Sequence, residues 1–322
     1  MTAPTPSVGL LVPPQVLAQP HERRRRYLEH VADAGVAHLA VGDHVSFHIG
    51  VGFDGLIQAT ALLAAQPRLP VTVAVYLLAL RHPVTVARSL ASIAELAPGR
   101  LTLGVGVGGE DRHEIEMCGV DPTTRGGRTD ECLHIVRALA GGDRIDHHGV
   151  HYNVTGAQIL PAIHPPTPLV IGGRSAAALE RAARYGDGWL AIWVSPRRLA
   201  SAVAQIADIA VGVDRADPPS RHQMNVWCGF GASAATARAA VAPAMEELYA
   251  SPFDRFDRYV PQGPPIRVAE RLAELSAAGA TAFNLIIPDE EPMRAAEHAG
   301  LVAQHLRDLL RPAHAGKVLN SG

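Results

Sequence analysis

Short runs of apolar residues alternate along the chain with longer segments in which apolar positions recur at helical spacing. The runs predict strands at 8–12, 38–41, 71–76, 101–105, 168–171, 188–193, 225–230 and 283–287. Predicted helices follow them at 22–34, 53–65, 83–97, 125–139, 176–185, 196–211, 234–248, 266–278 and 292–310. Runs such as VTVAV and FNLII are apolar at almost every position, which is typical of parallel strands covered on both faces. The pattern therefore predicts an α/β fold, a (β/α)8 TIM barrel.

The predicted domain organisation follows from the spacing of these elements. It is regular except between the fourth and fifth strands, where an insertion at about 107–167 holds a helix and a hairpin-like tract, DRIDHHGVHYNV. A length of 322 residues suits one barrel of roughly 250 residues with such an insertion. We expect a single domain at 1–312 and a disordered tail at 313–322.

Composition and charge exclude several classes of protein. A formal net charge of -2 provides no electrostatic footprint for nucleic acid or for an anionic membrane. No stretch is apolar over the roughly 20 residues that a transmembrane helix needs, and the N-terminus lacks a charged leader. The cysteines Cys118, Cys132 and Cys228 form no C-x-x-C pair, so we expect neither a disulfide framework nor a thiolate zinc site. These features favour a cytoplasmic protein.

The first candidate for chemistry is the pair Asp43 and His44, directly after the second predicted strand. In a (β/α)8 barrel the residues after the strands form the active face. Histidine exchanges a proton near neutral pH, and an adjacent aspartate can accept a cofactor proton or orient a neighbouring group. The alternative is a turn aspartate beside a structural histidine.

Glycines after the fourth strand form the second candidate, in LTLGVGVGGEDRHE. Gly106, Gly108 and Gly109 free the backbone to approach a ligand, and exposed N–H groups bind phosphate. The spacing of Gly104, Gly106 and Gly109 also matches G-x-G-x-x-G, but no amphipathic helix opens from the last glycine, which disfavours a dinucleotide-binding fold.

The third candidate lies after the fifth strand, where Gly172 and Gly173 precede Arg174 and Ser175. Ser175 opens a predicted helix, so free N–H groups and the helix dipole converge there beside the Arg174 charge. This arrangement predicts a phosphate site, although glycine turns before helices are also common for structural reasons. We predict no metal site, because the histidines of the insertion lack ligand partners at metal-binding spacing.

Three tracts together resemble the luciferase-like monooxygenase superfamily, and most closely its branch that uses coenzyme F420, a deazaflavin. They are RHPVTVARSLASIAELAPGRLTLGVGVGG, GVDPTTRGGRTDE and PLVIGGRSAAALERAARYGDGWL. The resemblance covers about residues 8–195 well and the last two strands loosely. It implies an oxidoreductase that transfers a hydride between the C5 atom of F420 and a small organic substrate, with His44 exchanging the accompanying proton.

The resemblance also assigns roles to individual residues. Asp43 and His44 correspond to residues that contact the cofactor and handle the substrate proton. Ala74 and Val75 fall where the family places a non-proline cis peptide behind the central ring. The implied phosphate contacts are Gly106, Gly108, Gly109, Gly172, Gly173 and Ser175. One departure concerns Gly109, which stands where some sugar-phosphate dehydrogenases of this branch carry a glutamate, while Glu110 is one position late.

Alternatives stay open at the level of sequence. An FMN-dependent enzyme of this superfamily would be a monooxygenase that uses reduced flavin and dioxygen, and a third possibility is a non-catalytic flavin-binding barrel. We expect the mouth to be lined by Val12, Pro13, His44, Phe47, Trp193 and Trp227, an aromatic and largely apolar set that favours an organic substrate with a hydrophobic body over a sugar phosphate. Arg174, Arg197 and Arg198 leave a substrate with anionic groups open as an alternative. The resemblance further implies a homodimer.

Overall fold

A computed structural model of the chain describes residues 5–48, 50–109 and 111–311. Parallel strands close into a barrel in the order β1-β12-β9-β8-β7-β4-β3-β2. They are β1 (Ser7–Leu11), β2 (His38–Val41), β3 (Val71–Leu77), β4 (Leu101–Gly106), β7 (Leu169–Gly172), β8 (Gly188–Ile192), β9 (Gln223–Trp227) and β12 (Ala282–Ile286). The predicted (β/α)8 barrel is confirmed, and the predicted strands differ from these only by a few residues at their ends.

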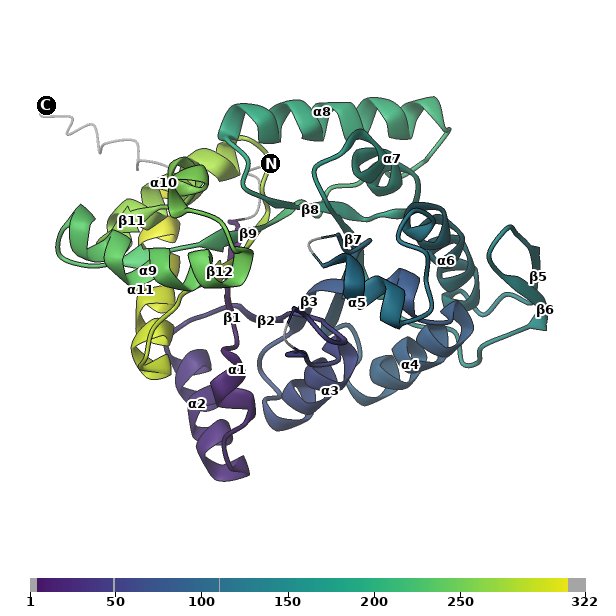
Figure 1. The fold of residues 1–322 in the computed structure, drawn as a ribbon, viewed down its shortest axis with the longest axis horizontal. Helices are drawn as coiled ribbons and strands as arrows, with labels where there is room; N and C mark the ends of the chain where they lie inside the picture. The colour runs from purple at the N-terminus through teal and green to yellow at the C-terminus, as the bar shows by residue number, and fades with distance from the viewer. Residues whose placement is uncertain (1–4, 49, 110, 312–322) are drawn as a thin grey trace, which may run out of the picture.

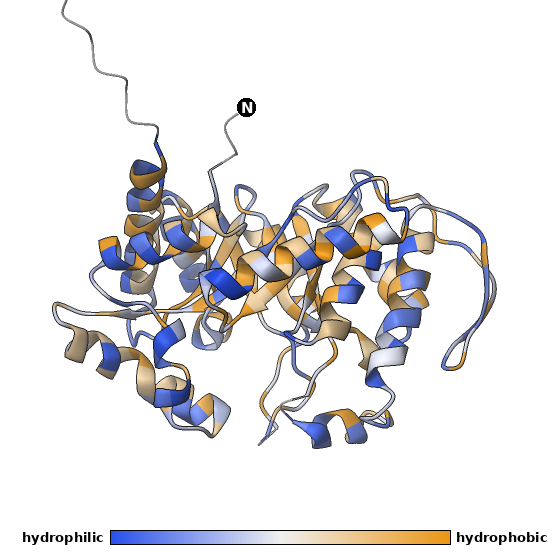
Figure 2. Cartoon of the chain, turned by 90° about the horizontal axis from the view of Figure 1, so that it is seen from above, coloured by the Kyte–Doolittle hydropathy of each residue, from blue (hydrophilic) through white to orange (hydrophobic). Residues whose placement is uncertain are grey.

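Helices surround the barrel, as Figure 1 shows. They are α2 (His21–Asp33), α3 (Gly55–Ala65), α4 (Pro83–Leu96), α6 (Arg125–Ala140), α7 (Ala176–Tyr185), α8 (Pro196–Gly212), α9 (Ala234–Tyr249), α10 (Pro265–Ala277) and α11 (Pro292–Leu310). In Figure 2 the central strands are largely hydrophobic, whereas the helices around them alternate hydrophobic and hydrophilic positions. This is the pattern expected when each helix buries one face against the barrel.

Local sequence explains where helices that face the barrel mouth begin. Asp54 caps α3 by accepting the N–H groups of Leu56 and Ile57, and Ser175 caps α7 through its hydroxyl oxygen and the N–H of Ala178. Side-chain caps of this kind satisfy N–H groups that have no partner inside the helix. The caps therefore fix the helix starts next to the strand ends that carry the candidate site.

The segment between β4 and β7 contains the predicted helix, now α6, and a hairpin of β5 (Ile145–His148) and β6 (Asn153–Ala157). Glu131 on α6 holds the hairpin tip by accepting the N–H groups of Val150, His151 and Tyr152. A short helix, α5 (Arg112–Met117), precedes α6 and is absent from the sequence-based prediction. Its position at the barrel mouth matters for the site described below.

Smaller elements complete the mouth. They are α1 (Pro14–Leu17), the 3-10 turns η1 (Leu78–Leu80), η2 (Phe253–Arg255) and η3 (Asp257–Tyr259), and a parallel pair of β10 (Gly229–Phe230) and β11 (Gln262–Gly263). The predicted strand at 225–230 is thus split between β9 and β10.

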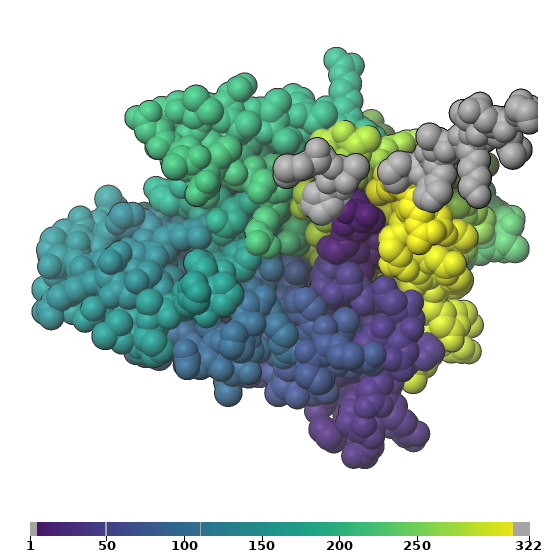
Figure 3. All heavy atoms as spheres, turned by 180° about the vertical axis from the view of Figure 1, so that it is seen from behind, coloured from purple at the N-terminus to yellow at the C-terminus, as the bar shows by residue number. Residues whose placement is uncertain are grey.

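Strand β1 closes the barrel by pairing with both β2 and β12. Figure 3 shows the consequence, since the purple N-terminal residues lie against the yellow C-terminal helix α11. No helix within the described ranges is both long enough and apolar enough to cross a bilayer. The predicted domain limit at 312 and the predicted tail at 313–322 lie outside the described residues.

Candidate active site

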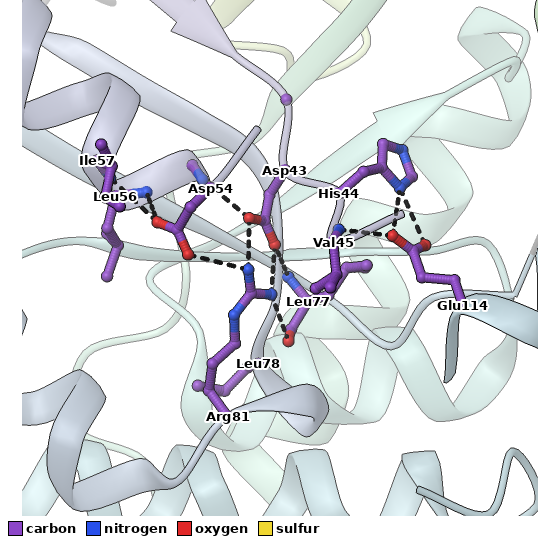
Figure 4. Close-up of polar contacts among 12 residues, drawn as sticks. Asp43, His44, Val45, Asp54, Leu56, Ile57, Leu77, Leu78, Arg81 and Glu114 are labelled. Atoms are coloured by element: carbon purple, nitrogen blue, oxygen red, sulfur yellow. Dashed lines mark hydrogen bonds and ion pairs between the residues drawn. The ribbon is translucent and has the colours of Figure 1, made fainter. Parts of the chain in front are cut away.

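Asp43 lies two residues beyond the end of β2, and its side chain is 0% exposed. Figure 4 shows its carboxylate turned toward Arg81, whose two terminal nitrogens donate to Oδ2 at 2.7 Å and to Oδ1 at 2.8 Å. The backbone N–H groups of Gly55 and Leu77 donate to the same two oxygens, each at 2.8 Å. An ionised carboxylate has about four acceptor positions, so these donors use its full capacity. The geometry supports a structural role for Asp43, which ties together the segments after β2 and β3.

Opposing effects act on the charges of this pair. Burial raises the pKa of Asp43, while the Arg81 guanidinium and the two backbone N–H groups oppose that rise. Burial alone would lower the pKa of Arg81, but Asp43 holds it above its ordinary value. Four N–H groups facing two oxygens require an ionised carboxylate, so we assign a buried ion pair. Arg81 also lies 3.1 Å from the Asp54 carboxylate and covers the Tyr76 ring at 4.3 Å.

His44 points away from this ion pair, toward α5 (Figure 4). Its Nδ1 lies 3.0 Å from Oε2 of Glu114, whose side chain is only 3% exposed. The other Glu114 oxygen accepts the N–H groups of Val45 at 2.7 Å and Ser46 at 3.0 Å. Because a carboxylate has no proton to donate, neutral His44 carries its hydrogen on Nδ1 and keeps a lone pair on Nε2. The pair is therefore arranged for proton exchange at Nε2.

Glu114 is a candidate site residue that sequence reasoning missed. The resemblance directed attention to Gly109 and Glu110, and Glu110 lies outside the described residues. Helix α5, which carries Glu114, spans only six residues, too few for hydrophobic periodicity to reveal it. A signal does exist, because Asp111 is a typical N-cap residue and it accepts the N–H groups of His113 and Glu114.

Ala74 and Val75 lie where β3 leaves the regular ladder. The peptide bond between them is cis, as the resemblance predicts, and the β3–β4 register shifts between Val73 and Tyr76. The Val75 side chain occupies a slot that exists because neighbouring strands carry glycine. A Cβ atom on Gly106 would lie 2.3 Å from Val75 Cγ2, and one on Gly172 would lie 2.8 Å from Val75 Cγ1. Both glycines are thus required by packing, which is a reason for them independent of phosphate.

The turns after β4 and β7 carry the candidate phosphate site. Gly108 has φ 72° and Gly173 has φ 115°, values that favour glycine. Arg174 adds a positive charge next to the N-terminus of α7, where backbone N–H groups lack intrahelical partners. Gly108, Gly173 and Arg174 all line the same cavity.

A cavity of about 340 Å³ opens among the predicted site residues. Asp43, His44, Ala74, Val75, Gly106, Gly108, Gly172, Gly173 and Arg174 line it, whereas Gly109 and Ser175 do not. The lining also has an aromatic and aliphatic part, a wall that consists of Phe47, Leu190, Ile192, Trp193, Leu248 and Tyr249. Among the residues expected at the mouth, Val12, Pro13 and Trp227 lie outside the lining. Trp227 instead packs behind the wall and donates to the Tyr249 hydroxyl at 3.1 Å.

Trp193 is the most unusual residue of this wall. Its backbone has φ 53°, in the left-handed region that large side chains rarely adopt, and such residues cluster at functional sites. Its ring packs against Tyr249 and Phe256 at 4.7 Å each, and Arg174 lies 5.3 Å from the ring centre. Its indole Nε1 is buried and has no hydrogen-bond partner within the described structure. A flat ligand that offers a hydrogen-bond acceptor fits this wall, because burying an unpaired donor is costly.

Acidic and metal-binding side chains are not gathered elsewhere in a way that points to a metal. In the described part of the chain, no three His, Cys, Asp or Glu side chains are placed to hold an ion. In the insertion, His147 lies 3.3 Å from Glu131 of α6, and His148 lies 2.9 Å from Asn153 of the facing strand β6. These two histidines therefore take part in hydrogen bonds that hold the hairpin.

A family comparison covers most of the chain. The family model described as luciferase-like monooxygenase matches residues 6–299. The chain belongs to the luciferase-like monooxygenase family. The match includes every barrel strand, both glycine turns and the His44–Glu114 pair, and it confirms the resemblance found in the sequence.

Two curated relatives align with parts of this luciferase-like protein. An uncharacterized protein of Mycobacterium tuberculosis is 34% identical over 173 residues, which is 54% of this chain and 59% of the relative. The F420-dependent glucose-6-phosphate dehydrogenase of Beutenbergia cavernae is 35% identical over 111 residues, 34% of this chain and 33% of that enzyme. The chain thus spans less than two thirds of the length of these relatives.

Solved structures share the fold of this luciferase-like protein. An F420-dependent secondary alcohol dehydrogenase in complex with an F420-acetone adduct has a TM-score of 0.81 and 17% identity, covering 94% of this chain and 100% of that one. The oxygenating constituent of 3,6-diketocamphane monooxygenase from Pseudomonas putida, in complex with FMN, has a TM-score of 0.75 and 15% identity, covering 94% and 98%. At these identities the likeness establishes the fold alone.

Proposed function

We propose that this protein is an oxidoreductase that transfers a hydride between coenzyme F420 and a small organic substrate. The observation that carries the proposal is the His44–Glu114 pair, 3.0 Å apart, at a cavity beside glycine turns that fit a phosphate. The relative that is an F420-dependent glucose-6-phosphate dehydrogenase supports the choice of cofactor. The fold shared with the F420-dependent secondary alcohol dehydrogenase is consistent with it.

The residues of the chain would divide the work as follows. When bound, the deazaflavin supplies or accepts the hydride, which is the cofactor's own chemistry. Glu114 holds the His44 ring through Nδ1, so Nε2 takes the hydroxyl proton when an alcohol is oxidised and returns it when a carbonyl is reduced. The N–H groups of Gly108 and Gly173 and the Arg174 charge would hold the phosphate. Trp193 Nε1 would donate to an acceptor of the ligand.

The cavity walls also bear on the class of substrate. The part of the lining that includes Phe47 and Tyr249 is aromatic and aliphatic. Among the described residues that line the cavity, Arg174 is the only basic side chain other than histidine. Because the phosphate of the cofactor would engage Arg174, the remaining space favours an uncharged organic substrate with a hydrophobic body.

An FMN-dependent monooxygenase is the second candidate. The observation that favours it is the shared fold with the FMN-bound 3,6-diketocamphane monooxygenase constituent, since FMN also carries one phosphate next to a flat ring system. The same turns and the same wall would hold it. A choice between the two ligands therefore depends on binding experiments.

Titration of the purified protein with F420 and with FMN, followed by cofactor fluorescence and absorbance, tests the proposal. We expect binding of F420 and, in an anaerobic substrate panel, oxidation or reduction that His44→Ala abolishes while binding persists. His113→Ala is the matched control, because His113 is exposed on α5 beside Glu114. Tight binding of FMN without affinity for F420 would overturn the choice of cofactor. Unchanged turnover in His44→Ala would favour a non-catalytic flavin-binding barrel.

Assembly and location complete the proposal. We propose a homodimer, which light scattering of the purified protein tests directly. A cytoplasmic location is consistent with Cys118, Cys132 and Cys228, all of which are free thiols.

A further inference from the structure

One level of the barrel interior is polar instead of apolar. Gly9 of β1 pairs in register with His38 of β2 on one side and with Asn284 of β12 on the other, and Asn284 pairs with Asn225 of β9. Four adjacent strands therefore place these residues at the same height. Asn284 is 0% exposed and His38 is buried. Barrel interiors are ordinarily filled at such levels by branched apolar side chains.

A continuous chain of hydrogen bonds connects this level to the cavity. His38 Nε2 lies 2.7 Å from Asn284 Oδ1, and Asn284 Nδ2 donates to Asn225 Oδ1 at 2.9 Å. Asn225 Nδ2 then donates to the backbone carbonyl of Ala74 at 3.3 Å. The ring of His38 passes over Gly9, where a Cβ atom would lie 2.2 Å from Nε2.

The Ala74 carbonyl, at the end of this series of hydrogen bonds, determines which group donates and which accepts in each of them. The Ala74 oxygen can only accept, so Asn225 must present its NH2 group to it and its oxygen to Asn284. The same reasoning turns the Asn284 oxygen toward His38, which must therefore donate from Nε2. Burial lowers the pKa of His38, which keeps the ring neutral with its hydrogen on Nε2.

The end of the chain coincides with a wall of the site. Ala74 lies where the β3–β4 register shifts, so its carbonyl needs a donor from elsewhere. Ala74, Val75 and Asn225 all line the cavity. Buried polar groups are costly unless fully paired, and apolar residues would fill this level at least as well. Departures from the apolar pattern of this kind are expected at functional sites.

We propose that Asn225, held by Asn284 and His38, positions the Ala74–Val75 wall against the cofactor ring. This inference depends on one part of the proposed function, which is that a cofactor with a flat ring occupies the cavity. Asn225 acts through the backbone, so it is a positioning residue, and the proton exchange at His44 is independent of it. Loss of the donor leaves the Ala74 carbonyl free to move and changes how closely the wall meets the ring.

The inference is tested by measuring how tightly the ring cofactor binds to three variants, which are Asn225→Ala, Asn284→Ala and the double variant. Each variant is titrated with whichever of F420 and FMN the wild-type protein binds. We expect each single variant to bind roughly tenfold more weakly, on the scale of one lost buried hydrogen bond, with a shifted absorbance maximum of the bound ring. The loss of cofactor affinity in the double variant should be smaller than the product of the two single losses, because each single substitution already breaks the same series of hydrogen bonds. Gln223→Leu is the control, since Gln223 is a buried polar residue of β9 that does not belong to this series of hydrogen bonds.

Several results would overturn the inference. Unchanged affinity and spectrum in a folded Asn225→Ala variant would do so, and so would fully multiplicative losses in the double variant. Nitrogen NMR of the wild-type protein provides a measurement that needs no variant to fold, because a His38 hydrogen on Nδ1 contradicts the direction of the chain. Binding of FMN in place of F420 would refute only the choice of cofactor, whereas binding of neither ring would refute both proposals.

Discussion

Replacement of Asp43 distinguishes between two roles for this residue, one as part of a structural ion pair and the other as a catalytic group. In Asp43→Ala, the N–H groups of Gly55 and Leu77 lose their acceptor. Arg81 keeps the Asp54 carboxylate, the Leu77 carbonyl and the Tyr76 ring as partners. The Arg81 side chain is 16% exposed, so water only partly replaces what is lost. Breaking a buried pair by removing one partner costs about 3–5 kcal/mol.

This loss translates into a measurable shift of the melting temperature. The unfolding entropy of globular proteins is about 2.1 cal/mol/K per residue near 60 °C, so a chain of this length should melt about 4–7 °C lower if it unfolds in one step. Differential scanning calorimetry at pH 7.5 of wild type and Asp43→Ala measures it. The control is Asp54→Asn, which keeps a side-chain oxygen for capping α3 and loses the partly exposed ion pair with Arg81, a change of about 1 kcal/mol or less.

The outcome that refutes the reasoning is specific. If Asp43→Ala melts with the wild type and still loses turnover, Asp43 acts on cofactor or substrate, as the family resemblance implies. If it melts lower and the surviving folded protein binds the ring normally, the structural role stands.

Three further predictions address the site and its surroundings. Glu114→Gln should lower kcat roughly 10–100-fold with a smaller change in KM, because the group that orients His44 loses its charge; steady-state kinetics measures it. Gly106→Ala should destabilise the protein by about 1–3 kcal/mol and weaken ring binding, because the new methyl group collides with Val75; denaturation and cofactor titration measure both. Burial lowers the pKa of His222 below its ordinary 6.5, so the unfolded state takes up a proton that the folded state refuses. The free energy of unfolding should therefore fall as pH drops below 6.5, by up to about 1.4 kcal/mol per pH unit for this group, and urea titrations of wild type and His222→Asn at several pH values should show a shallower slope in the variant.

Matched controls keep these tests interpretable. Glu116→Gln changes an exposed carboxylate on the same short helix and should leave kcat unchanged. Gly212→Ala adds a methyl group where no atom lies within 4 Å and should not destabilise the protein. Wild-type turnover in Glu114→Gln, wild-type stability in Gly106→Ala, or an unchanged pH slope in His222→Asn would each contradict the corresponding assignment.

The barrel was predictable because each of its strands and helices is marked by residues within a short stretch of sequence. Runs such as 71–77 and 282–286 are mostly apolar, with Thr72 and Asn284 as the clearest exceptions. Several of the surrounding helices begin at prolines or capping residues that the sequence displays. The predicted cis peptide between Ala74 and Val75 came from the resemblance instead, since neither residue type announces it.

The site was only partly predictable because its decisive contacts join distant positions. Asp43 beside His44 favours a catalytic interpretation in sequence, but the partner that saturates Asp43 is Arg81, which follows the next strand. Glu114 joins His44 across 70 positions from a helix too short to show a period. Gly106 was attributed to phosphate binding alone, whereas the structure shows that the Val75 side chain also needs its space.

The close approach of His38 to Gly9 has an evolutionary consequence. Any side chain at position 9 would occupy the volume of the His38 ring, with its first carbon 2.2 Å from Nε2. We therefore expect positions 9 and 38 to covary among homologous sequences. Sequences that lose the glycine should also replace the histidine by a smaller residue. An alignment of the family can reveal such paired replacement, and lineages that made it must support the Ala74 carbonyl by another donor.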